Sequence, residues 1–420
     1  MSLSSPMKLL VITHTFPPSK HSNAKRPQYL VRAFLEAGWE VDVATTYIGV
    51  VPGQKEAINH PKLKILRDND PVERLQGKFR KLKLHRISKL LSAASNGLLF
   101  PDCCALWAKR VCRRFKKDGE DYDRVLAFLI PASVFLSSSA GVVDRRWVFD
   151  FQEPITPQFE QYPRKSFVQR ALLGKLKRLE KDALHNAGLA VFTAEANRME
   201  YIERGIALAE RTKHVPYFYD EGAFQSEGKV GEGFEIGYYG NFDLMGARSP
   251  HVFLKSLAEF LERFPEARKT TRFVFFGNWL TRHDAIVDEL GLWDVCEINA
   301  VVPYEQYLQC LQASPILLLI VALEHNLFMP SKIVDYFGAR RPILAFVPEG
   351  SEMRGVLKKA GMEQYSCQSG DVEQGADALA RLWTAFGQEQ LSVDAEKTIG
   401  WSSSVLIPKY LDLLENLSKK

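Results

Sequence analysis

Short apolar runs alternate with helix-like patterns from the start of the chain. Lys8–Thr13 and Glu40–Thr45 are apolar and β-branched without regular alternation, which is typical of strands buried on both faces of a sheet. Between them, Arg26–Gly38 places Leu30, Phe34 and two alanines on one helical face, and its final glycine suits a helix end. Strand, helix and strand in such quick succession predict a βαβ unit and a parallel sheet.

The same alternation continues along the chain. The polar, Gly-rich stretch Gln225–Gly233 is the best candidate for a linker. We therefore predict an α/β protein with two Rossmann-like parallel-sheet domains, residues 1–224 and 234–400. Loops at the carboxyl ends of both sheets are expected to point into a cleft between them. Further strands are expected at Arg124–Leu129, Trp147–Phe151, Leu189–Thr193, Phe234–Gly240, Arg272–Phe276, Cys296–Ala300, Ile316–Val321 and Pro342–Phe346, and further helices at Gln169–Asn186, Pro250–Arg263, Asp284–Leu290, Tyr304–Ala313 and Lys332–Gly338.

Composition places the chain among ordinary globular proteins. It has 420 residues, of which 46% are apolar and 25% charged, which excludes disordered, collagen-like and disulfide-scaffold classes. The longest apolar run, Ile316–Leu323, is far shorter than the roughly 20 residues of a membrane span. Met1–Pro6 does not have the pattern of a secretory signal. Six cysteines without a Cys-x-x-Cys pair predict reduced thiols in a cytoplasmic protein.

Positive charge is concentrated in one segment, although the net charge is only +5. Between Arg74 and Lys117, thirteen Lys and Arg residues are opposed by Asp102 alone, so the rest of the chain is acidic. Within this segment, Lys78–Leu91 combines basic residues with a largely one-sided apolar pattern, which predicts a helix on an anionic membrane surface. A solvated basic face is the alternative. Nucleic acid is not expected as a partner, because the remainder is acidic and no nucleic-acid-binding motif is present.

The strongest chemical signal follows the buried strand at Ile316–Val321. Pro330 and Ser331 are suitable first residues of a helix, whose N-terminus attracts phosphate. Lys332 in the first turn is unfavourable against the helix dipole unless an anion lies between them. Asp335 lies one turn further on and can accept hydrogen bonds from ribose hydroxyls. The alternative is a solvated Lys and Asp on an ordinary helix.

This stretch resembles the glycosyltransferases of family 4, which have the GT-B fold, and most closely the branch that makes bacterial surface polysaccharides. The resemblance implies that Lys332 contacts the donor diphosphate and that Asp335 holds the ribose. In two places the chain departs from the family pattern: Asp335 replaces a glutamate, and Leu327 stands where the family has another, with Glu324 out of register. The residues that carry the resemblance are Pro330-Ser331-Lys332, Asp335-Tyr336 and Arg341-Pro342-Ile343-Leu344.

The first domain carries further parts of the pattern. Phe16-Pro17-Pro18 resembles the loop of the family's first βα unit, in which Ser22 and Asn23 stand in place of the usual glycines. Both residues can tolerate unusual backbone angles and are expected to bind the donor, with a plain turn as the alternative. His14, beside this loop, is expected to hydrogen-bond sugar or phosphate, or else to be a strand-end histidine. The segment Trp147–Pro154 (WVFDFQEP) resembles a strand that faces the cleft. It makes Asp150 and Glu153 candidate catalytic carboxylates, with a turn-capping role as the alternative.

In the second domain, the resemblance implies a set of donor-binding residues. Arg248 would pair with the diphosphate, and Asn241 and Asn278 lie in the turns after the first two strands of that domain. Val301 lies in a loop that resembles the one contacting the nucleobase. The C-terminal segment from 401 to 420 resembles the helix with which GT-B enzymes return to domain one and complete it.

These observations predict a hexosyltransferase that uses a nucleotide-diphosphate sugar, with UDP as the expected nucleotide, and a lipid-linked or saccharide acceptor at the inner membrane surface. Family members generally retain anomeric configuration and need no metal. The sequence shows no His/Cys cluster of usual metal-ligand spacing, so neither a metal nor another cofactor is expected. The alternatives are a GT-B nucleotide-sugar 2-epimerase and a degenerate domain that only binds a partner enzyme.

Overall fold

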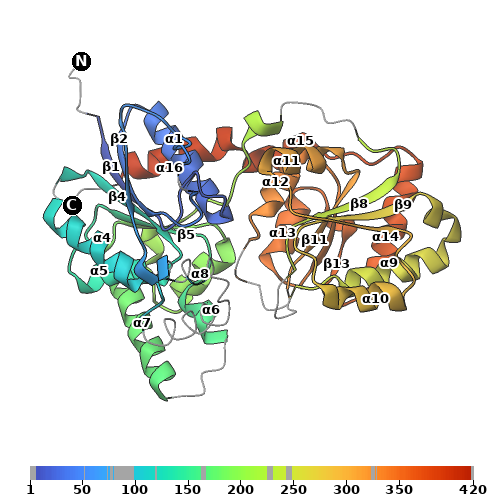
Figure 1. Cartoon of the computed structure of the whole chain (residues 1–420), viewed down its shortest axis with the longest axis horizontal. Coiled ribbons are helices and arrows are strands. Elements are labelled where there is room, and N and C mark those ends of the chain that lie inside the picture. The colour runs from blue at the N-terminus through green and yellow to red at the C-terminus, as the bar shows by residue number, and fades with distance from the viewer. Residues whose placement is uncertain are drawn as a thin grey trace. The chain divides into compact units, whose positions relative to one another are not determined.

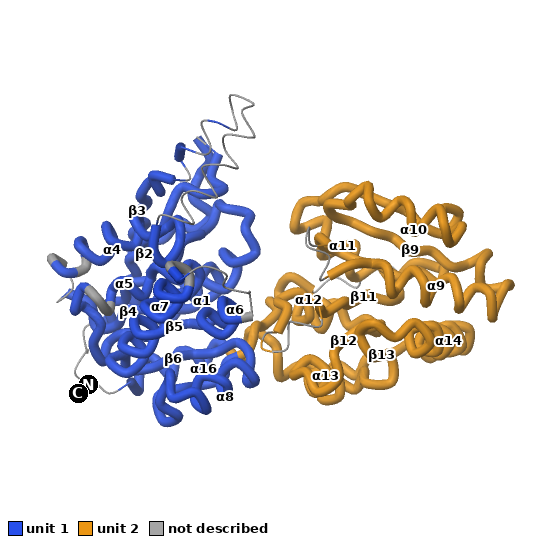
Figure 2. Tube along the Cα trace, turned by 90° about the horizontal axis from the view of Figure 1, so that it is seen from below, with its two compact units in different colours: residues 1–215, 407–420 blue, residues 216–406 orange. Residues whose placement is uncertain are grey.

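The computed structural model describes residues 6–51, 53–72, 74–75, 79, 99–118, 121–161, 167–224, 230–242, 248–322, 327 and 329–417. The predicted membrane-surface segment Lys78–Leu91 lies outside the described residues except for Phe79, and so does Glu324. The chain forms two compact units, one of residues 1–215 and 407–420 and one of residues 216–406 (Figure 2). It passes into unit 2 at Pro216, earlier than the expected linker Gln225–Gly233, and returns to unit 1 at Ile407.

Unit 1 is built on a parallel sheet whose strand order is β3-β2-β1-β4-β5-β6-β7 (Figure 1). The central strand β1 lies between β2 and β4, with Ile12 opposite both Ala44 and Ala127. Burial on both faces explains why these strands are continuously apolar. The strands are β1 (Lys8–Ile12), β2 (Glu40–Thr46), β3 (Leu63–Asp68), β4 (Arg124–Leu129), β5 (Trp147–Phe151), β6 (Leu189–Phe192) and β7 (Thr212–His214).

Helices cover both faces of this sheet. On one face, α4, α5 and α7 pack over a core that contains the fully buried Trp107 and Trp147. On the other face, α1 meets α16 through Phe34 and Tyr410, whose ring centroids are 6.4 Å apart. Gly38, with φ of +85°, follows the end of α1 as predicted. The helices are α1 (Lys25–Glu36), α4 (Ala105–Asp118), α5 (Leu136–Ser139), α6 (Thr156–Gln161), α7 (Phe167–Asn186), α8 (Glu195–Glu203) and α16 (Ser403–Glu415).

The C-terminal helix α16 is fastened to unit 1 by buried polar contacts. The Arg124 guanidinium, only 1% exposed, donates from Nε to the carbonyl oxygen of Leu414 at 2.9 Å. This contact satisfies a carbonyl at the helix end that has no partner within the helix. The hydroxyl of Tyr410 donates to Asp150 Oδ2 at 2.8 Å. The predicted return of the terminal helix to the first domain is therefore present in the structure.

Unit 2 contains a second parallel sheet, with strand order β10-β9-β8-β11-β12-β13. Helices α9, α10 and α14 share a core on one face of this sheet. The strands are β8 (Phe234–Tyr239), β9 (Thr271–Phe276), β10 (Cys296–Asn299), β11 (Ile316–Ile320), β12 (Ile343–Val347) and β13 (Ser366–Gln368). The helices are α9 (His251–Arg263), α10 (Asp284–Glu289), α11 (Tyr304–Ala313), α12 (Lys332–Ala339), α13 (Glu352–Lys359), α14 (Val372–Gly387) and α15 (Ala395–Thr398).

Each sheet reverses its winding direction at one pair of strands. In unit 1 this pair is β1 and β4, and in unit 2 it is β8 and β11. Loops that leave the carboxyl ends of such a pair diverge to opposite faces of the sheet, which opens a crevice where open α/β sheets bind ligands. The prediction of two Rossmann-like parallel sheets is confirmed. Among the described helices, none combines the length and apolar character that a membrane span requires.

Candidate active site

Two glycines bring the ends of β8 and β9 into close contact. The Gly240 N–H donates to the carbonyl oxygen of Phe276 at 2.9 Å. A Cβ at Gly277 would lie 1.9 Å from the carbonyl oxygen of Gly240, so only glycine fits there. Gly240 has φ of +147°, and a Cβ on it would lie 2.9 Å from Nζ of Lys332. At the end of β8, beside the switch point of the unit 2 sheet, the main chain of Gly240 therefore lies next to Lys332 with no side chain between them.

Lys332 is the first residue of α12, and its ammonium is buried above an aromatic ring. Nζ lies 4.1 Å from the centroid of Tyr238, within range of a cation–π interaction. Nζ has no hydrogen-bond partner among the described residues. A buried ammonium that lacks a partner costs free energy, because water is lost and no acceptor replaces it. This cost would be recovered if an anion bound beside it.

The electrostatics of Lys332 agree with an anion site. Burial, followed by repulsion from Arg248, lowers the pKa of Lys332 to about 7. Two cationic side chains are thus brought close enough to interact at the end of β8. An anion placed between them would favour the protonated form of Lys332 and raise its pKa again.

The start of α12 adds backbone donors to the same site. The helix begins at Lys332, as predicted, and Ser331 is its N-cap. The Ser331 side chain makes no capping hydrogen bond, and the Ile333 N–H bonds the carbonyl oxygen of Pro330 at 3.1 Å. The positive end of the helix dipole therefore lies where the ammonium of Lys332 also lies. Pro330, Ser331 and Lys332 are together in the arrangement that the sequence predicted.

Asp335 lies one turn along α12 and is engaged by α11. Its Oδ2 accepts a hydrogen bond from the Tyr307 hydroxyl at 3.0 Å, and the residue is 8% exposed. Burial and the neighbouring Asp335 raise the pKa of Tyr307, so this hydroxyl stays a donor. Tyr307 stacks with Tyr304 at 5.7 Å between ring centroids. Val301, just before α11, is 63% exposed.

The two asparagines predicted at the strand ends contact one another. The Asn278 N–H donates to Asn241 Oδ1 at 2.9 Å, so the turns after β8 and β9 are linked by a side chain as well as by glycine packing. Both asparagines are exposed. Their position beside Gly240 and Gly277 follows from the parallel pairing of β8 with β9, which ends with Tyr239 opposite Phe276.

A cluster of aromatic and histidine side chains packs around the Tyr238 ring, which lies below the ammonium of Lys332. The sequence did not predict this cluster. Phe242 stacks on Tyr238 with 4.6 Å between centroids and meets Trp279 edge-on at 6.0 Å. His283 is 1% exposed, contacts the Phe242 ring and exchanges a 3.2 Å hydrogen bond with His251. Burial and His251 lower the pKa of His283 to about 4, so it is neutral at ordinary pH. Only the closely spaced aromatics around β8 and β9 could have signalled this cluster.

In unit 1, the structure contradicts the expectation that Asp150 offers an accessible catalytic carboxylate. Asp150 is fully buried. Arg26 donates to both of its oxygens, and Tyr410 donates to Oδ2. A carboxylate with these partners holds α1, β5 and α16 together and is not exposed to a reactant. Glu153 is half-buried near the end of the same strand, and its catalytic role stays a prediction.

The loop after β1 forms a plain turn at the two residues that stand in place of the family's glycines. Ser22 and Asn23 form a short 3-10 turn with Ala24 that leads directly into α1. Neither has a left-handed backbone, so the unusual angles that these residues can tolerate are not adopted here. The reason is local: a continuous helical winding from Ser22 satisfies the backbone without a positive φ. Their predicted contact with the donor is untested.

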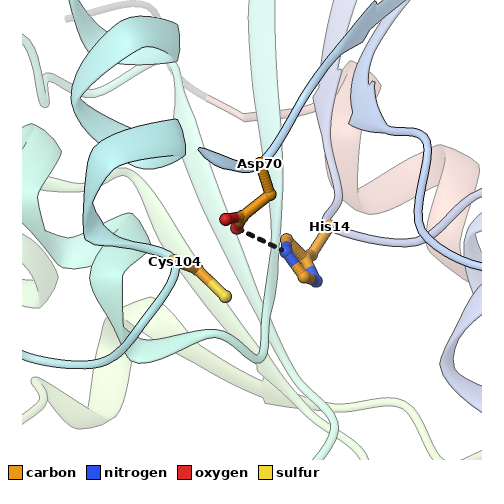
Figure 3. Close-up of side chains that lie close together, drawn as sticks. All are labelled: His14, Asp70 and Cys104. Carbon is orange, nitrogen blue, oxygen red and sulfur yellow. Dashed lines mark hydrogen bonds and ion pairs between the residues drawn. The ribbon is translucent and has the colours of Figure 1, made fainter. Parts of the chain in front are cut away.

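His14 lies in a group that sequence spacing did not reveal. It follows β1, and its Nε2 is 3.4 Å from Asp70 Oδ2 (Figure 3). Its ring meets Trp107 edge-on at 5.2 Å. Cys104 completes the group, with one ligand atom of each residue within 4.8 Å of the others. The three residues come from well-separated segments, so no short motif could have indicated their meeting.

Comparisons with solved structures identify the fold. Sucrose-phosphate synthase from Thermosynechococcus elongatus matches with a TM-score of 0.66 and 14% identity, over 98% of this chain and 99% of that chain. A glycosyltransferase from Rickettsia africae ESF-5 matches with a TM-score of 0.63 and 10% identity, over 99% and 100%. An E. coli structure described as trehalose-6-phosphate bound with UDP-2-fluoro glucose matches with a TM-score of 0.63 and 14% identity, over 98% of this chain and 99% of that chain.

These likenesses extend over nearly the whole of both chains, and they confirm the predicted GT-B fold. At 10–14% identity they show the fold alone. No protein-family model matches the chain, and no curated protein matches it in sequence. Membership of family 4 and of its surface-polysaccharide branch stays a prediction from the motifs.

Proposed function

We propose that this chain is a glycosyltransferase and that its unit 2 binds the diphosphate of a nucleotide-diphosphate sugar. The observation that carries this proposal is the buried ammonium of Lys332, which has no hydrogen-bond partner among the described residues and lies near Arg248 at the start of α12. A diphosphate supplies the acceptors and the negative charge that this corner requires.

The same groups would assist departure of the diphosphate. When the bond between the anomeric carbon and its phosphate oxygen breaks, the sugar develops oxocarbenium character and the leaving diphosphate gains negative charge. Lys332, Arg248 and the N–H groups at the start of α12 are held in place before the reaction, so they stabilise this charge without reorganisation. The bare backbone at Gly240 leaves room for a phosphate oxygen beside the ammonium.

The rest of the donor is assigned to neighbouring elements. Asp335, positioned by Tyr307, would accept from ribose hydroxyls, and the exposed Val301 would contact the base. We propose uridine as that base, because the E. coli neighbour is bound with UDP-2-fluoro glucose. We further propose transfer with retention, since one solved neighbour, a trehalose-6-phosphate synthase, is described in terms of glycosyltransfer with retention.

For the acceptor, we propose a lipid-linked or free saccharide at the inner membrane surface, in bacterial surface polysaccharide synthesis. The support is the motif resemblance around Lys332 and the basic segment Lys78–Leu91. The trehalose-phosphate and sucrose-phosphate synthases make phosphorylated sugars, so a sugar phosphate is the other acceptor class to test.

Calorimetry with UDP-glucose, GDP-mannose and free UDP tests the proposal directly. We expect at least one of these to bind, and Lys332→Met to weaken its binding about a hundredfold, which corresponds to about 2.7 kcal/mol. Lys359→Met, which changes an exposed lysine of the same unit, is the matched control. If Lys332→Met bound the ligand as tightly as the parent protein, the assignment of the diphosphate to this corner would be wrong.

Product analysis separates the alternatives. Incubation of the bound nucleotide-sugar with saccharide, lipid-linked saccharide and sugar-phosphate acceptors should yield a glycosylated product and the nucleoside diphosphate. An epimerised sugar formed without acceptor would identify a 2-epimerase instead. Failure of every nucleotide and nucleotide-sugar to bind would favour the degenerate binding partner.

A further inference from the structure

We propose that His14, Asp70 and Cys104 form a binding site for a zinc ion in unit 1. The residues come from the segment after β1, the segment after β3 and the start of α4, and their side chains converge on one point (Figure 3). Each contributes one ligand atom, a ring nitrogen of His14, a carboxylate oxygen of Asp70 and Sγ of Cys104, and these atoms all lie within 4.8 Å of one another. All three residues belong to unit 1, and the proposal does not depend on the function proposed for unit 2.

The distances fit a tetrahedral ion better than a simple hydrogen bond. His14 Nε2 and Asp70 Oδ2 are 3.4 Å apart, which is beyond the usual range for N–H···O hydrogen bonds. Zinc bonds to nitrogen and oxygen of about 2.0–2.1 Å give a tetrahedron with edges of about 3.3–3.4 Å. The sulfur of Cys104 would have to move closer to the other two ligand atoms by up to about 1.2 Å to reach its own zinc distance. An ion would thus occupy a gap that is already nearly the right size.

The chemistry of the three donors favours zinc among common divalent ions. Imidazole, carboxylate and thiolate are its three usual protein ligands, whereas magnesium and calcium prefer oxygen alone. One carboxylate and one thiolate would neutralise the 2+ charge, which matters because Asp70 is 4% and Cys104 is 7% exposed. Three protein ligands leave the fourth position of the ion for water or another oxygen donor.

Each ligand is already held in place by its surroundings. Asp102 accepts from the N–H groups of Cys104 and Ser133, both at 2.9 Å, which fixes the start of α4. The Val72 N–H donates to Asp70 Oδ1 at 2.9 Å and turns the carboxylate, whose Oδ2 lies toward His14. Such fixed ligands lose little conformational freedom when a metal binds, and sites of this kind bind tightly.

Contacts of the His14 main chain and ring also hold its imidazole in place. The carbonyl oxygen of His14 accepts from the Thr46 hydroxyl at 2.7 Å, and the His14 ring rests against the fully buried Trp107. The imidazole is therefore oriented by contacts that involve neither Asp70 nor Cys104. The ion would join the ends of β1 and β3 to α4, at the carboxyl edge of the sheet, where open α/β sheets bind ligands.

The test measures zinc in the purified full-length protein. After exposure to Zn²⁺ with a reductant and dialysis against metal-free buffer, we expect one zinc per chain by mass spectrometry. Cys104→Ala and His14→Phe should each weaken zinc binding about a hundredfold or more, because even residues that only orient ligands contribute tenfold to a hundredfold. Cys112→Ala is the matched control, since Cys112 lies in α4, which begins directly after Cys104, and both cysteines are 7% exposed. It should retain the metal.

Cobalt gives a readout that does not depend on stability. Co²⁺ bound to the parent protein should show the intense absorption of a thiolate–cobalt bond and the visible bands of a tetrahedral ion. Cys112→Ala should keep both, and Cys104→Ala should lose the thiolate band. A parent protein that retains no zinc, or equal zinc in the parent and Cys104→Ala proteins, would overturn the proposal and leave a buried His–Asp pair beside an inert thiol.

Discussion

Arg26 and Asp150 form a buried ion pair across 124 residues of sequence. Nε of Arg26 is 3.0 and 3.1 Å from the two carboxylate oxygens, and Nη2 is 3.0 Å from Oδ2. Arg26 is 3% exposed and Asp150 is not exposed at all. Tyr410 of α16 donates to the same carboxylate, so Asp150 links the first helix of unit 1 to its last helix.

This arrangement predicts that Asp150 contributes stability. Asp150→Asn keeps the shape of the side chain but leaves Arg26 charged, buried and unbalanced, which should cost about 3–5 kcal/mol of unfolding free energy. Denaturant unfolding measures the change. Asp144→Asn, in a partly exposed pair with Arg146, should have little effect. An Asp150→Asn protein of unchanged stability that had lost sugar transfer would restore the catalytic role expected from the sequence.

Lys332 is predicted to destabilise the protein that has no ligand. Its pKa in the folded state, about 7, lies below the ordinary value of 10.5, so the unfolded chain binds more protons between these values. The penalty is complete below pH 7 and disappears as the pH rises toward 10.5. Each unit of pKa corresponds to about 1.4 kcal/mol, so Lys332→Met should stabilise the free protein by a few kcal/mol at pH 6.

Thermal unfolding at pH 6 and pH 9 checks this prediction. Lys332→Met should unfold at a temperature several degrees higher than the parent at pH 6, and the difference should shrink at pH 9. Lys359→Met should match the parent at both pH values. A Lys332→Met protein that is less stable than the parent at pH 6 would show that the ammonium has a favourable partner in the free protein.

Donor affinity should fall as the pH rises above about 7. Below this value Lys332 is already protonated in the free protein, so binding takes up no proton and the affinity is constant. Above it, binding of an anion requires Lys332 to gain a proton, and the affinity decreases up to tenfold per pH unit. UDP-glucose is the suitable probe, because its diphosphate does not titrate in this range. Calorimetry on Lys332→Met should show no such slope, whereas an equal slope in both proteins would assign it to another group.

Gly240 is predicted to be required for binding more than for folding. A Cβ at this position would lie 2.9 Å from Nζ of Lys332, and the backbone has φ of +147°. Gly240→Ala should displace the ammonium and weaken UDP-glucose binding about tenfold or more, with a stability cost of about 1–3 kcal/mol from backbone strain.

The matched control is Gly355→Ala, at an exposed position of α13. Nothing lies within 4 Å of the Cβ that it would add, and alanine favours a helix by about 1 kcal/mol, so this variant should bind normally and be slightly more stable. Unchanged binding by a folded Gly240→Ala protein would contradict the role assigned to the bare backbone at Gly240.

The sequence determined the elements whose residues are all buried or regularly spaced. Strands such as Arg124–Leu129 and Trp147–Phe151 were predicted with their observed bounds, because a parallel strand covered on both faces is continuously apolar. Helix α12 was predicted to begin at Lys332, since Pro330 and Ser331 favour a helix start. Lys332 and Asp335, which we propose bind the donor, could be selected together in this way, because they lie one turn apart on one helix.

The tertiary structure alone decided which distant residues meet. Strand β3 (Leu63–Asp68), at the edge of its sheet, is only partly buried and lacks a strong pattern, so it was not predicted. For the same reason Asp70, which follows it, was not connected with His14 and Cys104. Asp150 was predicted to be an accessible carboxylate, but its burial depends on Arg26 and Tyr410, which the parallel sheet and the returning helix bring to it. The local pattern of apolar residues determines whether a segment forms a strand or a helix. These contacts depend instead on the order of the strands and on the path of the terminal helix, about which the local pattern carries no information.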